Sequence, residues 1–129
     1  MSQPNTHLLT DPRLVGAVVS VGDAAATAEL QTTANMAVDA QGLVHGGFVF
    51  GLADYAAMLA VNDPNVVLGG ADVRFLKPVA AGALVRATAQ VDVVKGRKHI
   101  VLTSASVGDV VVFEGTFTCF VLDEHVLGA

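Results

Sequence analysis

The most constraining feature of this chain is a long apolar segment, residues 46–61, that contains a single charged side chain, Asp54. Its length and its apolarity on every side predict a buried helix at about residues 46–62 rather than a strand. The sequence Asp-Pro-Asn at 63–65 is expected to end this helix, because proline cannot continue it. Other elements must therefore enclose the helix.

A carboxylate in such surroundings is expensive to desolvate. Asp54 is therefore expected to be paired, to be protonated, or to have a raised pKa that serves chemistry. The helix opens with His45, Gly46 and Gly47, so two backbone N–H groups are offered with no side chain in the way. A carboxylate poised as a base and a glycine-rich helix start, seven or eight residues apart, suggest a site for one bound carbonyl group.

Alternating apolar and polar residues predict strands on both sides of the helix. The expected strands are 14–21, 24–31, 66–77, 83–95, 98–107 and 110–122. This order predicts an α+β fold, in which an antiparallel sheet of five to six strands wraps around one long central helix. Residues 1–13 are expected to form a loose N-terminal lead-in, and residues 14–129 a single domain.

The composition favours a self-associating protein. Hydrophobic residues make up 53% of the 129 residues, yet Asp54 interrupts the longest apolar run before it reaches the length that spans a bilayer. The excess of apolar side chains is therefore better explained by a subunit interface than by a membrane partner. We expect a homodimer or a homotetramer.

Several other classes of function are disfavoured. A formal net charge of −5 argues against nucleic acid as a partner. The four histidines show no paired spacing, so no metal site is expected. The single cysteine, Cys119, lies in an apolar strand pattern and is expected to be a buried, inert thiol in a reducing cytoplasm. Residues 1–12 lack the apolar stretch of a signal peptide, and the expected localisation is cytoplasmic.

Two segments carry a resemblance to a known family: VHGGFVFGLAD at 44–54 and ADVRFLKPVAAG at 71–82. Together with the element order, they resemble the hotdog-fold acyl-CoA thioesterases of the phenylacetate-pathway type over roughly residues 14–122. The resemblance implies the hotdog fold and the hydrolysis of an acyl-CoA thioester to free acid and coenzyme A. It implies no cofactor, since coenzyme A is part of the substrate.

The resemblance also assigns roles to residues. Asp54 matches the family's catalytic carboxylate, which acts as a general base on water or as a nucleophile. The oxyanion donor falls on the backbone N–H of Gly46 or Gly47, and His45 matches the histidine that helps to hold the thioester. In this family the site lies between two subunits, so Asp54 of one chain is expected to face residues 45–47 of the other.

The sequence departs from the family pattern at two places. Asp39 stands where related enzymes often carry an asparagine that orients water, and a second carboxylate close to Asp54 would raise the pKa of Asp54. Leu68, Gly69 and Gly70 stand where related enzymes often carry a serine or threonine. Asp39 is equally well interpreted as a loop-turn residue.

Basic residues are candidates for binding the phosphates of coenzyme A. Three of them cluster at one predicted turn: Lys95, Arg97 and Lys98. The alternative is a solvated hairpin tip. Arg74 and Arg86 are further candidates, although each could instead pair with Asp72 or Asp92 across the sheet.

Two other functions remain open. The first is a non-catalytic acyl-CoA-binding module, as in hotdog domains attached to transcriptional regulators; the presence of Asp54 and the short segment before residue 14 favour the enzyme. The second is an enoyl-CoA hydratase or dehydratase that pairs Asp39 with His45, although their spacing departs from the hydratase motif. Purely structural roles are also possible, with Asp54 paired to a buried arginine and His45 satisfying backbone groups at the helix start.

Overall fold

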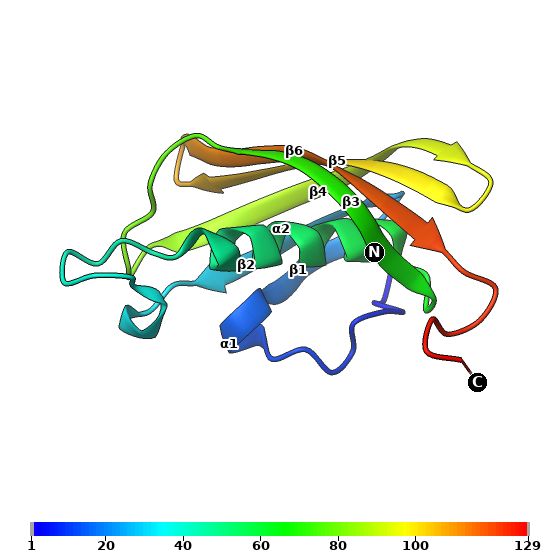
Figure 1. The fold of residues 1–129 in the computed structure, drawn as a ribbon, viewed down its shortest axis with the longest axis horizontal. Coiled ribbons are helices and arrows are strands. Elements are labelled where there is room, and N and C mark those ends of the chain that lie inside the picture. The colour runs from blue at the N-terminus through cyan, green and yellow to red at the C-terminus, as the bar shows by residue number, and fades with distance from the viewer. Residues whose placement is uncertain (1, 129) are drawn as a thin grey trace.

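The computed structural model describes residues 2–128 and contains one sheet and one long helix (Figure 1). The elements in chain order are α1 (Pro12–Val15), β1 (Ala17–Gly22), β2 (Ala25–Gln31), the 3-10 turn η1 (Ala34–Met36), α2 (Gly46–Val61), β3 (Val66–Phe75), β4 (Leu84–Lys95), β5 (Lys98–Val107) and β6 (Val110–Val121).

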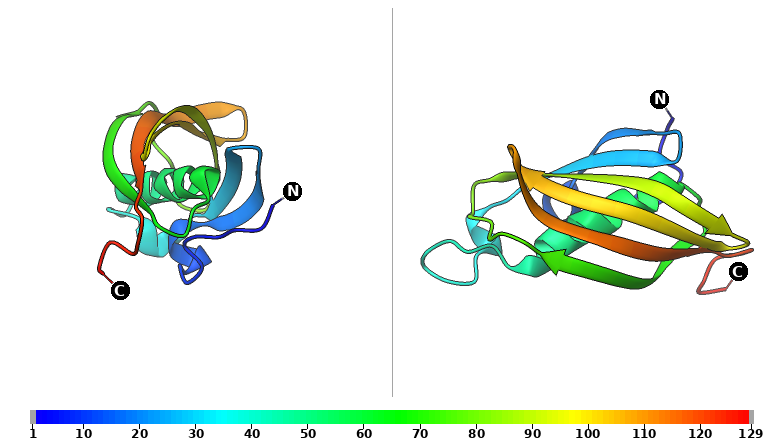
Figure 2. Two further views of the ribbon diagram at one scale, coloured as in Figure 1. Left: turned by 90° about the vertical axis from the view of Figure 1, so that its right-hand side faces the viewer. Right: turned by 90° about the horizontal axis from the view of Figure 1, so that it is seen from above.

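The six strands form one antiparallel sheet in the order β1-β2-β4-β5-β6-β3. The sheet curls around α2, which Figure 2 shows end-on and from above. Strands β1 and β3 are the two edges of the sheet. The predicted α+β architecture, a hotdog fold with one central helix, is confirmed.

Helix α2 is buried because its apolar side chains meet the concave face of the sheet. Leu52, Ala53 and Ala56 are fully inaccessible to solvent. The helix ends at Val61, one residue before the predicted end, and Asn62 adopts the left-handed conformation that commonly follows a helix (φ 56°).

Strand β4 shows how the predicted alternation fixes the sheet's inner face. Val85, Ala87 and Ala89 are buried, whereas Arg86 and the other polar residues between them are exposed. The register shifts between Val91 and Val93 of this strand, so the alternation ends there and Val93 is exposed. The alternation in the sequence places Val93 on the same face as Val85, Ala87, Ala89 and Val91, and this prediction is wrong for Val93.

The N-terminal lead-in is more ordered than expected. The Ser2 N–H donates to the Val21 carbonyl at 2.7 Å, and the Asn5 N–H donates to the Asn62 side chain at 2.7 Å. Thr6 is buried. Residues 2–6 of the lead-in are therefore held against the rest of the domain, whereas Leu8 and Leu9 are exposed.

Strand β1 begins three residues later than predicted because a short helix precedes it. Asp11 caps this helix by accepting the Arg13 N–H, and Pro12 occupies the first turn, where proline is favoured. Gly16 then adopts a φ of +107°, with its Cα so close to the Leu52 side chain that a Cβ would lie 2.6 Å from it. Leu14 thus belongs to α1.

Strand β3 ends at Phe75 and not at Lys77. The N–H groups of Leu76 and Lys77 both donate to the carbonyl of Val112, at 2.8 and 3.3 Å, instead of continuing the strand ladder. This change of direction brings the end of β3 to the start of α2, which is the region of the candidate site.

Candidate active site

The start of α2 leaves backbone donors free. His45 is the N-cap residue, but its side chain makes no capping hydrogen bond. Within residues 2–128, the N–H groups of Gly46 and Gly47 have no acceptor. Free N–H groups and the positive end of the helix dipole together favour an oxygen that carries negative charge.

A side chain at either glycine would crowd a neighbouring ring. A Cβ on Gly46 would lie 3.1 Å from the Phe75 ring, and a Cβ on Gly47 would lie 2.9 Å from Nε2 of His45. The His45 ring is exposed and meets the Phe48 ring edge-on, with 6.2 Å between the centroids. The rings of Phe75 and His45 therefore lie close to Gly46 and Gly47, respectively.

Asp54 lies two turns further along α2 and is only partly accessible to solvent. Its Oδ1 atom is buried and has no hydrogen-bond partner among the described residues. Burial raises the pKa of Asp54 from the ordinary value near 3.8 to about 6. Of the three outcomes expected for this carboxylate, the structure thus shows the raised pKa and not an ion pair. A base with a pKa near 6 is ionised at neutral pH and is stronger than an ordinary aspartate.

The helix also carries one member of an aromatic cluster that the sequence did not single out. Phe50, one turn before Asp54, packs against Phe117 and Phe113 with centroid distances of 5.4 and 6.5 Å, and Phe113 in turn packs against Phe75 at 5.1 Å. Four of the six phenylalanines thus form a cluster that reaches the start of α2. Phe50 was visible as the residue four positions before Asp54, but the other three meet only through the strand pairing of β3 with β6.

Cys119 on β6 is fully buried, as expected. Burial and the negative charge of Asp54 raise the pKa of the Cys119 thiol to about 12. The thiol is therefore not a nucleophile at neutral pH.

One copy of the chain cannot bring Asp54 to its own helix start. Gly47 and Asp54 lie on the same face of α2, but a rise of 1.5 Å per residue separates them by about 10 Å along the axis. A general base must lie within about 3 Å of the proton that it takes, or one water molecule away. The two features can therefore act on one carbonyl only if a second copy supplies one of them.

Asp39 does not join this group in the described chain. It lies in the exposed loop before α2, where its Oδ1 accepts the N–H groups of Gln41 and Leu43 at 3.0 and 3.3 Å. No hydrogen bond or ion pair joins Asp39 to His45 within residues 2–128, and burial alone accounts for the pKa of Asp54. The loop-turn interpretation of Asp39 therefore describes this structure.

Gly69 has a packing explanation, whereas a Cβ on Gly70 would meet no atom within 4 Å. A Cβ on Gly69 would lie 2.3 Å from the Phe120 ring, so a serine or threonine cannot stand at this position without moving that ring. The register between β3 and β6 shifts at the same place, between Leu68 and Gly70.

The basic residues are spread over two regions. Lys95, Arg97 and Lys98 lie at the β4–β5 hairpin, at the opposite end of the domain from the start of α2 (Figure 1). Arg97 pairs with Asp123. Arg74 is exposed on β3.

The ion pairs expected across the sheet are not formed. Arg86 lies 3.8 Å from Glu29 on the neighbouring strand β2, so the pairing of Arg86 with Asp72 or Asp92 is wrong. Arg74 forms no ion pair with a described residue, which includes Asp72.

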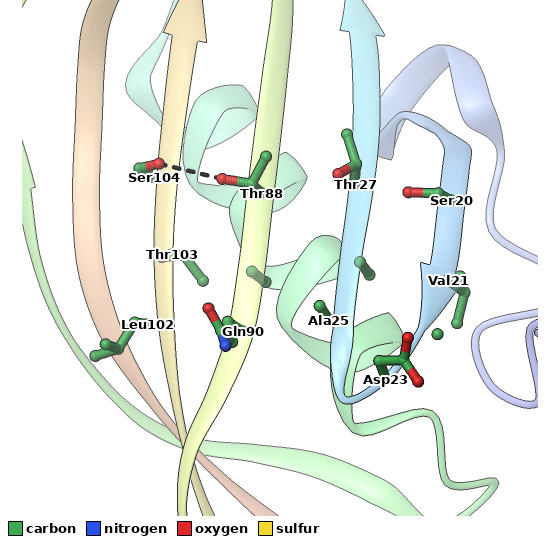
Figure 3. A pocket seen from close by; sticks show the side chains of 13 residues that line it. Ser20, Val21, Asp23, Ala25, Thr27, Thr88, Gln90, Leu102, Thr103 and Ser104 are labelled. Atoms are coloured by element: carbon green, nitrogen blue, oxygen red, sulfur yellow. Dashed lines mark hydrogen bonds between the residues drawn. The ribbon is translucent and has the colours of Figure 1, made fainter. Parts of the chain in front are cut away.

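Two hollows adjoin the start of α2. One of about 300 Å³ adjoins Gly46 and Phe75, and one of about 1010 Å³ lies beside Phe48 and α1. A separate groove of about 550 Å³ crosses β1, β2, β4 and β5 on the far side of the sheet from α2 and is lined by hydroxyl groups (Figure 3). Neither Asp54 nor the helix start lines this groove.

Residues 2–128 contain no group of three or more His, Cys, Asp or Glu side chains that could hold a metal ion. None of their helices is both long and apolar enough to cross a membrane.

Solved structures show the same architecture. The chain is 51% identical to the uncharacterized protein PH1136 from Pyrococcus horikoshii, with a TM-score of 0.97 over 98% of this chain and 97% of that one. It is 29% identical to a mutant of the phenylacetic acid degradation protein PaaI from Thermus thermophilus, with a TM-score of 0.77 over 84% of this chain and 95% of that one. Residues 41–102, which include Asp54 and the start of α2, match the family model described as the thioesterase superfamily.

Curated relatives are longer proteins. Over 119 residues the chain is 50% identical to the methylthioribose-1-phosphate isomerase of Aquifex aeolicus. The matched region is 92% of this chain but 26% of that protein. Over 85 residues it is 29% identical to the transcription factor FapR of a Thermoanaerobacter strain. Here the matched region is 66% of this chain and 42% of that protein. The chain thus spans about a quarter of the first relative and less than half of the second.

Proposed function

Because this chain belongs to the same family as PH1136 and carries a hotdog domain whose residues 41–102 match the thioesterase superfamily, we propose that it hydrolyses acyl-CoA thioesters. The observation that carries the proposal is Asp54, a half-buried carboxylate without a partner and with a raised pKa. It shares one face of α2 with a helix start whose N–H groups are free.

The reaction uses these two features in sequence. The N–H groups of Gly46 and Gly47 bind the thioester oxygen and stabilise the negative charge that develops on it. Asp54 takes a proton from water, whose oxygen attacks the carbonyl carbon. The tetrahedral intermediate then releases the thiolate of coenzyme A, which takes up a proton, and the free acid remains. His45, exposed beside Gly47, helps to position the thioester.

A second copy of the chain supplies the missing half of each site. Strand β3 is an unpaired edge of the sheet, and the face of α2 that holds Gly47, Gly51 and Asp54 is more exposed than the face toward the sheet. An unpaired edge can pair with its own copy about a twofold axis. Such a homodimer would set Asp54 of one protomer opposite the helix start of its partner.

The test is the substitution Asp54→Asn, which keeps the shape of the side chain and removes the base. We expect kcat for a panel of acyl-CoA thioesters to fall by about 10²–10⁴-fold. The matched control is Asp92→Asn, which neutralises an exposed carboxylate on β4 and is expected to leave kcat unchanged. Sedimentation shows whether the oligomer persists. Unchanged turnover by Asp54→Asn rejects the proposal.

The likeness to FapR favours one second candidate, an acyl-CoA-binding module without catalysis. Calorimetry with intact acyl-CoA distinguishes the two functions. Tight binding without release of free coenzyme A supports the binding module, whereas multiple turnovers support the hydrolase.

A further inference from the structure

The edge strand β3 carries two opposite charges that have no partner in one copy of the chain. Asp72 and Arg74 are both exposed, and because they are two residues apart they project from the same, outer face of the sheet. Neither forms an ion pair with a described residue, although Glu114 of β6 stands opposite Arg74. Strand β6 lies on one side of β3, and no described strand lies on the other.

Pairing of β3 with its own copy about a twofold axis allows few alignments. Residues that face each other in an antiparallel pair project to the same side of the sheet, so the axis must pass through one residue of β3 and not between two. The regular part of the strand is 70–75, because its pairing with β6 shifts between Leu68 and Gly70 and ends at Phe75. An axis near the middle of this part passes through Asp72 or Val73.

The charges favour Val73 over Asp72. An axis through Asp72 sets this carboxylate against its own copy, and like charges directly opposite each other are destabilising. An axis through Val73 sets Asp72 of each protomer against the partner's Arg74, which gives two opposite-charge pairs. It also sets the small Ala71 against the partner's Phe75, whose ring is 55% exposed in one copy.

The geometry of α2 leads to the same alignment. Gly46 lies beside the Phe75 ring, and Asp54 follows Gly46 by eight residues, which is about 12 Å along the helix axis. Strand β3 runs back along α2 in the opposite direction (Figure 1), and its residues from Phe75 to Ala71 span about 13 Å. Asp54 therefore lies near the level of Ala71. An axis through Val73 brings the partner's Phe75, and with it the partner's Gly46, to this level.

We propose that two ion pairs, each between Asp72 and the partner's Arg74, set the alignment of two protomers and so hold Asp54 of one copy opposite the helix start of the other. The inference rests on the proposed function, because the shared site is what the alignment serves. Exposed ion pairs add little affinity, but the same charges exclude alignments in which like charges meet. Arg74 thus acts between copies of the chain and not on the phosphates of coenzyme A.

Single cysteines identify the residue on the axis without altering a charge. A cysteine on the axis faces its own copy with about 4.5–5.5 Å between Cα atoms, which a disulfide can bridge. We expect Val73→Cys to form a cross-linked dimer under mild oxidation and Ala71→Cys to form none. An axis through Asp72 would instead cross-link only a mixture of the two variants. Cys119 is buried and does not compete.

Charge reversal tests whether the ion pairs set this alignment. Asp72→Arg and Arg74→Asp each place like charges opposite each other in both pairs, so we expect the dissociation constant of the dimer to rise about tenfold or more. A one-to-one mixture of the two variants restores both opposite-charge pairs and should form mixed dimers with the affinity of the unaltered protein. The matched control is Asp92→Arg, which makes the same change of charge on β4 and should leave the affinity unchanged.

These measurements do not depend on hydrolysis, so the alignment and the proposed function are judged separately. A cross-link formed by Ala71→Cys alone or only by the cysteine mixture, no cross-link at all, a monomer in sedimentation, or unchanged affinity in both charge variants overturns the alignment. Release of coenzyme A by the unaltered protein then still decides the hydrolase. If Val73→Cys cross-links and the charge mixture recovers affinity while no acyl-CoA is hydrolysed, the hydrolase proposal fails and the alignment stands.

Discussion

The two ends of helix α2 differ in whether their backbone groups have hydrogen-bond partners. At the C-terminal end, Asn62 donates its N–H to the Met58 carbonyl at 2.8 Å, and its side chain forms hydrogen bonds with the backbone of Asn5 and Gln3 in the lead-in. At the start, Gly46 and Gly47 have no side chain to offer and their N–H groups meet no acceptor within residues 2–128.

This difference separates stability from function along one element. Satisfied groups at a helix end stabilise the fold, whereas unsatisfied groups cost free energy unless water or a ligand meets them. The closed end therefore fixes the helix in the domain, and the open end is available to a substrate. Substitutions at the two ends should affect different measurements.

The largest expected effect is at the open end. Gly46→Pro removes one N–H donor but suits the first helical position, and His45 already has the extended backbone (ψ 129°) that precedes proline. We expect kcat to fall by about 10²–10³-fold, the usual loss for one oxyanion donor.

The control is Gly46→Ala, which adds a similar Cβ beside Phe75 and keeps the N–H. It should retain most of the activity. Equal losses in the proline and alanine variants would mean that crowding of Phe75, and not the missing donor, causes the defect.

The next effect is a pH dependence caused by Asp54. As the pH rises, kcat/KM should increase, whereas the contribution of Asp54 to the free energy of unfolding should decrease. The pKa of Asp54 is raised to about 6 in the folded chain, so the base is protonated below this pH. We expect kcat/KM to rise with pH and to level off above about pH 6. A rate that does not change between pH 5 and 7 would exclude Asp54 as the base.

Stability should move the other way. A carboxyl group whose pKa is higher in the folded state favours folding when it is protonated, below about pH 4, and this contribution is lost as the pH rises to about 6. The loss is on the order of 3 kcal/mol. Chemical unfolding of Asp54→Asn should show a higher free energy of unfolding than the unaltered chain at pH 7, and little difference at pH 4.

At the closed end, Asn62→Ala should cost about 1–2 kcal/mol of stability, because alanine disfavours the left-handed conformation and loses the two side-chain bonds. Asn62→Gly keeps the backbone freedom and loses only the bonds, so it should cost less. Thermal unfolding measures both variants. A large fall in kcat in either variant would contradict the separation of the two ends.

The smallest effect is expected at the β4–β5 hairpin. Arg97 and Asp123 form an exposed ion pair, so Arg97→Ala should change the free energy of unfolding by less than about 1 kcal/mol. If Lys95, Arg97 and Lys98 contact the phosphates of coenzyme A, KM for acyl-CoA should rise severalfold while kcat stays constant. An unchanged KM would mean that these residues form a solvated hairpin tip and do not bind coenzyme A.

Local patterns in the sequence predicted most of the fold. An unbroken apolar run gave the helix within one residue, and the alternation in β4 gave its buried face as far as Val91, because both patterns depend on neighbours along the chain. Helix α1 was missed, since four residues starting at Pro12 are too few to show a helical period. The bulge that exposes Val93 could not be predicted, because the alternation of residue types continues through it.

The site was predictable only where it is continuous in sequence. Asp54, Gly46 and Gly47 lie on one helix, so their spacing in the sequence predicted their relative positions. The contact of Phe75 with Gly46 depends on how β3 turns towards Val112, and the packing of Phe113 on Phe75 depends on strand register. The raised pKa of Asp54 follows from its burial, whose extent depends on the folded chain.

The most direct test of the central claim is complementation between two inactive variants. In a mixed dimer of Asp54→Asn with Gly46→Pro, a site shared between protomers keeps one intact pairing, Asp54 from one protomer and Gly46 from the other. A random one-to-one mixture should then recover about a quarter of the original activity, because half of the dimers are mixed and each holds one intact site of two. Activity no higher than that of the separate variants, in a mixture whose subunits have exchanged, would contradict a site built from two copies of this chain.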